Sequence, residues 1–257
     1  MEEKGTEVNL TRIKGNKREE ISDLVAKETT FTILLNKKKL VNLNCSPEKY
    51  EYLGLGFLYT SGILQKKEDI ISLDINEKQG LMDIKIKGVS LSPEDIINSN
   101  LWMGSYRQSE KQRKTPLSID TSLKIISNLV YSLISEMQGR ANFFKLTGGV
   151  HSCALADKNG SIIFFSEDIS RYNTIDKILG EAFVNDITTE DKIILTSCRI
   201  TSGILKKIII GRLLIVISRA APTDLAIKLA KKVGITLVGF VRGERMNIYT
   251  HPERIEI

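Results

Sequence analysis

The sequence predicts an α/β protein, in which a sheet covered by helices on both faces follows a smaller α+β domain. From about residue 150 onward, short strands alternate with helices, which indicates crossover connections and a largely parallel sheet. Residues 193–195 and 213–217 are continuously apolar, as in strands buried on both faces. Residues 30–86 show hairpin strands around one helix, which predicts the smaller domain.

The first half of the chain divides into three parts. Residues 1–27 are charged and lack an apolar period, so we expect a loose N-terminus. Residues 28–98 form the predicted α+β domain, whose helix begins at Ser46-Pro47, an N-cap followed by proline. Its strands are expected at residues 30–35, 40–44, 70–75 and 81–86. Residues 99–118 are polar and basic, which predicts a linker or loop between domains.

Residues 119–257 form the predicted larger domain. It begins with a long helix whose apolar stripe runs from Leu123 to Met137. The elements expected after it are a hairpin of strands 152–156 and 162–166, helix 173–184, strand 193–196, helix 202–210, strand 213–218, helix 223–233 and strand 237–241. Ligands of such sheets bind where the strands end, and here the ends carry hydroxyl groups, arginines or both.

The amino-acid composition excludes several classes of protein. The chain has 257 residues, of which 42% are hydrophobic and 26% charged, and these values exclude a disordered or collagen-like chain. No apolar run approaches the roughly 20 residues of a membrane-spanning helix. The first residues are charged and do not resemble a secretory signal, so we expect a cytoplasmic protein without membrane association.

Positive charge is concentrated near the end of the chain. The net charge is +6, yet residues 199–245 alone hold ten basic residues against two acids. Such a field attracts phosphate groups on a nucleotide, a nucleotide-bearing cofactor or a nucleic acid. The alternative is a set of solvated helix faces. Aromatic residues are only 6% of the chain, which argues against a stacking surface for nucleic acid.

The cysteines and histidines do not form a metal-binding pattern. Cys45, Cys153 and Cys198 contain no C-x-x-C pair, and His151 and His251 are the two histidines, so we predict no metal site. An odd, sparse cysteine count is typical of a reducing compartment. Cys198 lies beside an arginine before a predicted helix, where a lowered pKa would make it a thiolate; the alternative is a small residue filling a tight turn.

Several polar residues at predicted strand ends are candidates for ligand binding. His151 follows two glycines that allow close backbone approach, and Arg171 and Asn173 lie in the first turn of a predicted helix. The other candidates are Arg199, Ser218, Thr223, Phe240, Val241, Arg242, Gly243, Glu244 and Arg245. The two arginines around a glycine suit a phosphate or a guanine edge. Capping, tight turns and surface ion pairs are the structural alternatives for these residues.

Three common signatures are absent from the sequence. There is no G-x-x-x-x-G-K-[ST] and no G-x-G-x-x-G, which removes the usual nucleotide and dinucleotide motifs. The segment from His151 to Cys153 lacks the glutamate and paired cysteines of the zinc deaminases.

Taken together, several segments resemble the FdhD/NarQ family, the formate dehydrogenase accessory sulfurtransferases. The segments that carry the resemblance are residues 43–64, 147–157, 166–177, 196–202, 218–224 and 234–250. Each is weak alone, but their order and spacing are specific, and they extend over about residues 28–252.

The resemblance implies a fold, a cargo and partners. The larger domain would have a cytidine-deaminase-like three-layer α/β/α fold, and the protein would be a homodimer. A cysteine desulfurase would supply sulfur, carried as a persulfide on a C-x-x-C loop. The cargo would be the molybdenum bis-molybdopterin guanine dinucleotide cofactor, which is sulfurated for formate dehydrogenase. The cofactor-binding segment of the family maps onto residues 240–245.

The sequence departs from the family pattern at the sulfur-carrying loop. Asn100 and Met103 stand where the two cysteines would be, and neither side chain can hold a persulfide. Tyr172 replaces a histidine, and Cys198 replaces a glycine. Trp102 of the same loop either stacks on a pterin or anchors the loop.

Three hypotheses follow from the resemblance and these departures. In the first, the chain binds and delivers the cofactor as a chaperone that has lost sulfur transfer. In the second, sulfur transfer is kept and the thiol has moved to Cys198. In the third, the chain is a basic nucleic-acid-binding module, whose affinity would depend steeply on salt.

Overall fold

The structure of the protein is a computed structural model that describes residues 4–89 and 123–257. The predicted linker at residues 99–118, with Asn100, Trp102 and Met103, lies outside the described residues. No helix of the described parts is long and apolar enough to cross a membrane.

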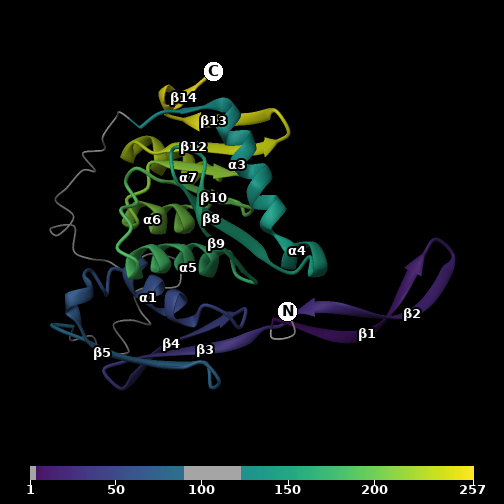
Figure 1. The fold of residues 1–257 in the computed structure, drawn as a ribbon, viewed down its shortest axis with the longest axis horizontal. Coiled ribbons are helices and arrows are strands. Elements are labelled where there is room, and N and C mark those ends of the chain that lie inside the picture. Colours follow the sequence, from purple (N-terminus) through teal and green to yellow (C-terminus); the bar gives the residue numbers. More distant parts are fainter. Residues whose placement is uncertain (1–3, 90–122) are drawn as a thin grey trace.

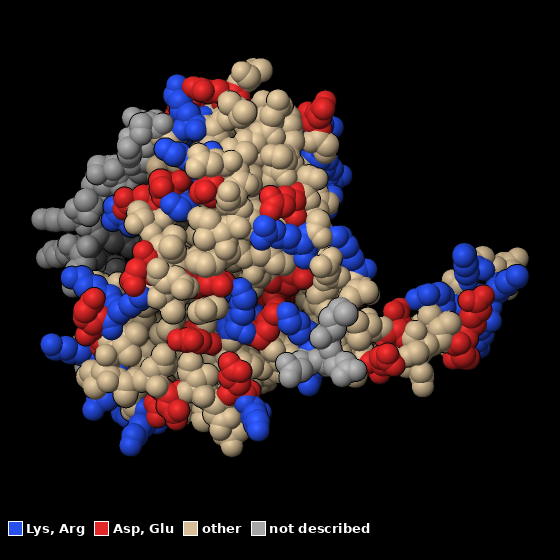
Figure 2. All heavy atoms as spheres, viewed as in Figure 1, with Lys and Arg blue, Asp and Glu red and all other residues tan. Residues whose placement is uncertain are grey.

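The chain begins with a two-stranded antiparallel ribbon that projects away from the rest of the molecule (Figure 1). Its strands are β1 (Gly5–Lys14) and β2 (Lys17–Ala26), so the expectation of a loose N-terminus is wrong. Contacts across the ribbon stabilise it, such as the 2.7 Å ion pair of Arg12 with Asp23, and both signs of charge appear along it (Figure 2). Cross-strand pairs join residues distant in sequence, so the pattern along one strand does not reveal them.

The smaller domain is a four-stranded sheet with one helix packed against it. The strand order is β4-β3-β6-β5, formed by β3 (Thr29–Leu35), β4 (Lys38–Cys45), β5 (Ile70–Asn76) and β6 (Leu81–Ile86). Helix α1 (Tyr50–Thr60) follows β4, and the short 3-10 helix η1 (Lys67–Asp69) precedes β5. Phe31 and Ile33 of β3 pack with Leu53 of α1, and all three are completely buried. The strands and helix predicted for this domain are therefore present, but the predicted helix start at Ser46-Pro47 is wrong, since α1 begins at Tyr50 after Lys49.

The larger domain contains a mixed six-stranded sheet in the order β13-β12-β11-β10-β8-β9. The strands are β8 (His151–Ala156), β9 (Ile162–Asp168), β10 (Ile193–Thr196), β11 (Ile215–Ser218), β12 (Thr236–Arg242) and β13 (Arg245–Thr250). Only β10, β11 and β12 are mutually parallel, so the prediction of a largely parallel sheet is wrong. Tight turns connect β8 to β9 and β12 to β13, and a tight turn necessarily makes its two strands antiparallel.

Helices cover both faces of this sheet (Figure 1). On one face lie α5 (Arg171–Val184), α6 (Ser202–Ile210) and α7 (Asp224–Val233), and on the other lies α3 (Ser127–Arg140). The side chains of the continuously apolar strand β10 pack into the cores on both faces of the sheet. Its Ile193 and Leu195 belong to the core of α3, whereas Ile194 belongs to the core of α5 and α6. The predicted α/β class and the three layers are confirmed.

The long helix of the larger domain starts later than its apolar stripe predicts. Residues Ile125–Ile126 form the short strand β7. This strand pairs in parallel with β14 (Ile255–Glu256), which follows the 3-10 helix η3 (Pro252–Arg254) along the chain. A six-residue helix, α4 (Asn142–Thr147), then follows α3. Buried Glu167 of β9 accepts hydrogen bonds from the backbone N–H groups of Phe143 and Phe144, which satisfies the start of α4.

Helices α1 and α5 join the two domains at very close range. A Cβ atom at Gly56 would lie 1.9 Å from the carbonyl oxygen of Asp176. A Cβ atom at Gly180 would lie 2.0 Å from the carbonyl oxygen of Tyr52. Any larger residue at either position therefore forces the helices apart, because both clashes involve backbone atoms.

Two buried ion pairs of the larger domain lie at the same junction. Lys177 lies 2.7 Å from Asp168, and Lys207 lies 2.8 Å from Asp176, with all four side chains almost completely buried. Ser46, at the end of β4, donates its backbone N–H to Asp168 at 3.1 Å. The carboxylate of Asp168 in the larger domain is thus hydrogen-bonded to the backbone of the smaller domain.

Candidate functional site

The parallel strands β10, β11 and β12 end at one edge of the sheet, here called the carboxyl edge. His151 begins β8, which runs antiparallel to β10, so it also lies at this edge. Neighbouring strands are about 4.8 Å apart, so the axes of β10 and β12, which flank β11, are roughly 10 Å from each other. The segments 197–199 and 218–223 therefore lie side by side, and β12 continues past its last pairing with β11, at Val238, so that residues 242–245 project beyond this edge.

His151 lies among positive charges. Burial is the main cause that lowers the pKa of this half-buried imidazole below its usual 6.5, and Arg171 and Arg199 lower it further. Asp168 acts in the opposite direction. His151 is therefore neutral at pH 7 and offers one N–H donor and one acceptor to a ligand.

The turn between β12 and β13 forms an exposed tip at the carboxyl edge. Arg242 pairs with Arg245 in the register of the hairpin, and Gly243 between them has a φ of 55°. The Arg242 guanidinium lies 6.0 Å from the centre of the Phe240 ring. The exposed tip thus carries two arginines, one of which lies over the partly exposed ring of Phe240.

Some predicted site residues instead support the framework. Val241 is 1% exposed and packs in the core, so its side chain cannot contact a ligand. Buried Ser218 donates to the carbonyl oxygen of Cys198 at 2.7 Å. Thr223 caps α7 by accepting from the backbone N–H of Ala226. In the structure these three residues make packing, loop-bracing and helix-capping contacts.

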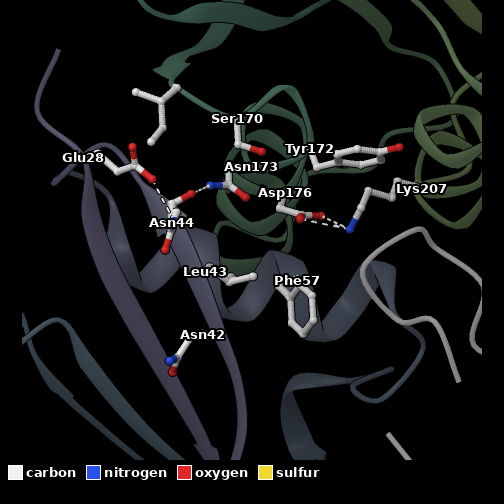
Figure 3. A pocket seen from close by; sticks show the side chains of 11 residues that line it. Glu28, Asn42, Leu43, Asn44, Phe57, Ser170, Tyr172, Asn173, Asp176 and Lys207 are labelled. Atoms are coloured by element: carbon white, nitrogen blue, oxygen red, sulfur yellow. Dashed lines mark hydrogen bonds and ion pairs between the residues drawn. The ribbon is translucent and has the colours of Figure 1, made fainter. Parts of the chain in front are cut away.

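Asn173 contacts the smaller domain from the first turn of α5 (Figure 3). It is 4% exposed, and its Nδ2 donates to the carbonyl oxygen of Asn44 at 2.9 Å and to Asp168 at 3.0 Å. Its side chain faces the smaller domain rather than the arginines. Its contacts in the structure are thus with the smaller domain and with Asp168 of β9.

Arg219 is a residue of this edge that the sequence analysis did not select. It directly follows β11, between the ends of β10 and β12, and its backbone N–H donates to Thr196. Its Nε is buried and has no hydrogen-bond partner among the described residues. The sequence signal that could have identified Arg219 is its place directly after the buried strand that ends at Ser218. We call Arg171, Arg199, Arg219, Arg242 and Arg245 the basic rim.

Cys198 is not an activated thiol in this structure. It is 2% exposed, and burial raises its pKa despite the opposing hydrogen bond with Thr196 and the nearby arginines. Helix α6 begins only at Ser202, with Thr201 as its N-cap. The prediction of a lowered pKa is wrong because the helix start is too distant and the side chain points into the protein.

The other two thiols are equally enclosed. Cys45 and Cys153 have no exposed surface. Burial raises the pKa of Cys45 to about 11 and that of Cys153 well above its usual value. Among the described residues, no group of three or more His, Cys, Asp or Glu side chains could hold a metal ion.

Comparison with known proteins identifies the family. A model of the FdhD/NarQ family matches residues 26–256 of this chain. The chain belongs to the FdhD/NarQ family. The predicted resemblance is thereby confirmed.

Its relatives are similar over nearly their whole length. A protein of Shouchella clausii named sulfur carrier protein FdhD is 31% identical and aligns with 98% of this chain and 97% of its own. The protein of that name from Bacillus subtilis is 35% identical over 91% of each chain. A crystal structure from Desulfotalea psychrophila, described as a formate dehydrogenase accessory protein, superposes with a TM-score of 0.80 at 26% identity. It covers 98% of this chain and 99% of that one.

Proposed function

We propose that this chain is an accessory protein of formate dehydrogenase that binds the molybdenum bis-molybdopterin guanine dinucleotide cofactor as cargo through the basic rim. The observation that carries the proposal is the charge of that rim. None of its five arginines lies within 4.0 Å of a carboxylate of the described residues. Uncompensated guanidinium groups at the ends of parallel strands favour a phosphate-bearing ligand.

The hairpin tip adds a means of selecting guanine. Arginine presents fixed donors that suit phosphate oxygens bidentately. The carboxylate of exposed Glu244 can accept from the N1–H and N2–H groups of guanine, a pair of donors that adenine lacks. Phe240, which is 36% exposed, offers a ring face for stacking.

We further propose that this chain delivers the cofactor without carrying sulfur on its own cysteines. Persulfide transfer requires an accessible thiolate. All three cysteines of the chain are buried, and each has a raised pKa. The proposal of a cofactor chaperone is therefore better supported than a thiol relocated to Cys198.

The same proposal includes partners and a compartment. Formate dehydrogenase would receive the cargo, and a cysteine desulfurase and a second copy of this chain are the other partners that the family resemblance implies. The cytoplasm is the proposed location, and unpaired cysteines are in keeping with its reducing conditions.

Calorimetric titration with GDP and with ADP at low and high salt tests the cofactor site. We expect GDP to bind more tightly than ADP, and Arg242→Ala to weaken GDP roughly tenfold or more. Lys228→Ala removes an exposed charge on α7 and serves as the control, which should leave the affinity unchanged. Base-indifferent binding that disappears at high salt would refute the proposal and favour a nucleic-acid-binding module.

A further inference from the structure

The ribbon formed by β1 and β2 is a long projection on an otherwise rounded molecule. Figure 1 shows it extending away from the body, and helix α4 lies against the base of β2. At about 3.4 Å per residue, its ten-residue strands make it roughly 30 Å long. A two-stranded ribbon is only marginally stable in water unless it packs against another surface. We therefore expect a partner surface to cover it.

One face of the ribbon carries an apolar stripe. Facing residues of an antiparallel pair lie on the same face, and so do alternate residues along each strand. The register therefore places four apolar side chains on one face, namely Val8, Leu10, Ile21 and Val25. The first three are half-buried, and Val25 is 38% exposed. The contacts across the ribbon thus cover this apolar surface only in part.

Charge is segregated along the ribbon. The tip, residues 12–18, contains four basic residues and no acid, whereas the shaft, residues 5–11 and 19–26, contains four acids and no basic residue. In Figure 2, blue side chains gather towards the far end and red ones lie nearer the body. Lys14 of the tip and Glu7 of the shaft have no ion pair within 4.0 Å among the described residues. Both charges are therefore available to another molecule.

We propose that the ribbon is a dimerisation arm, which packs along the ribbon of a second copy of this chain. A two-fold axis across the middle of the two ribbons sets apolar stripe against apolar stripe. The same axis lays each basic tip beside the acidic shaft of the other copy. A partner surface of a single charge sign would instead leave either the tip or the shaft unmatched. The two strands supply about 20 of the roughly 20–30 residues that each side of a standard interface contributes.

This inference deepens the proposed function, on which it rests only for a second copy as a partner. The proposed function assigns that copy no surface, and the arm supplies one. All of the ribbon except Ala26 precedes residues 26–256, the part that matches the family model. The argument for the arm therefore depends on the apolar stripe and the charges of this chain itself.

Sedimentation velocity of the full chain over a series of concentrations measures the association. We expect a species of twice the 28.8 kDa of one chain. Leu10→Ser removes an apolar contact from both copies and should raise the Kd of the dimer at least about tenfold. The matched control is Ile13→Ser, which makes the same kind of change at a residue that is 74% exposed on the opposite face. It should leave the Kd unchanged.

Two charge reversals test how the arms are aligned. Lys14→Glu on the tip and Glu7→Lys on the shaft should each weaken self-association, because like charges then approach each other in the dimer. An equimolar mixture of the two variants should associate more tightly than either variant alone, because opposite charges face each other again in the mixed dimer. This comparison keeps the test informative even where Leu10→Ser loosens the ribbon itself.

Three outcomes overturn the inference. They are a parent chain that stays monomeric at micromolar concentration, a dimer that Leu10→Ser does not weaken, and charge variants whose mixture is no tighter than each alone. GDP titration separates this test from that of the basic rim. The Leu10→Ser chain should still bind GDP, because the rim belongs to other elements. Loss of GDP binding in the parent chain would refute the cofactor site and leave the arm unaffected.

Discussion

Replacing Lys207 tests how strongly the junction between the domains depends on one buried ion pair. The side chains of Lys207 and Asp176 are 1% and 2% exposed, and they are 2.8 Å apart. Thr60 of α1 donates to the same carboxylate at 2.6 Å and accepts from Lys207. The substitution Lys207→Met preserves most of the aliphatic volume. It leaves the Asp176 carboxylate buried without its cation.

The expected loss of stability is large. Removing one partner of a buried ion pair costs about 3–5 kcal/mol, because the remaining charge stays desolvated. That is a substantial part of the roughly 5–15 kcal/mol that stabilises a typical domain. For a chain of this length it corresponds to a decrease in Tm of about 6–20 °C. Urea unfolding monitored by circular dichroism, with thermal unfolding in parallel, measures both quantities.

Two further variants separate the causes. Lys228→Met removes an exposed ion pair at 3.4 Å, with both side chains 75% exposed, and should cost at most about 1 kcal/mol. Lys207→Met combined with Asp176→Leu removes both charges and should recover much of the lost stability. A Lys207→Met chain within about 1 kcal/mol of the parent would refute the reasoning, since that is the range of an exposed pair.

Two other predictions concern the thiols and His151. Because the three thiols are buried and the pKa of Cys45 is about 11, iodoacetamide should modify the native chain far more slowly than the urea-unfolded chain. Incubation with a cysteine desulfurase and cysteine should give no persulfide on this chain. Persulfide labelling that Cys198→Ser abolishes would instead support the hypothesis that Cys198 carries the sulfur. The folded pKa of His151 is lowered, so the unfolded chain binds more protons and stability decreases as pH falls through 6.5. His151→Gln should flatten this dependence in urea midpoints measured across that range, and an unaltered slope would contradict the assignment.

Local sequence patterns were sufficient to predict most individual helices and strands. The apolar runs of β10 and β11 and the bounds of α6 and α7 lie within one residue or so of where the sequence predicts them, because burial and helix periodicity act over a few neighbouring residues. The N-terminal ribbon and α4 could not be predicted in this way. The ribbon depends on pairing across two strands, and the start of α4 depends on Glu167, which lies more than 20 residues away in sequence.

The residues of the candidate site likewise divide into features that local sequence patterns predict and features that depend on tertiary contacts. The position of the arginines after buried strands predicts correctly that several of them share the carboxyl edge. Which neighbouring side chain faces outward was not predictable, because it depends on the twist and bulge of each strand end. Val241 points into the core while Arg242 beside it is exposed, and the hairpin register is irregular at this point.

The sequence by itself determined the α/β class, the order of most elements, the concentration of positive charge and the family resemblance. These properties follow from composition, periodicity and short motifs, which are local. Only the tertiary structure decided that Cys198 is buried, that Asn173 faces the smaller domain, and that Arg219 joins the rim. Burial, pKa and the direction of a side chain depend on residues brought together from distant parts of the chain, so no local pattern contains them.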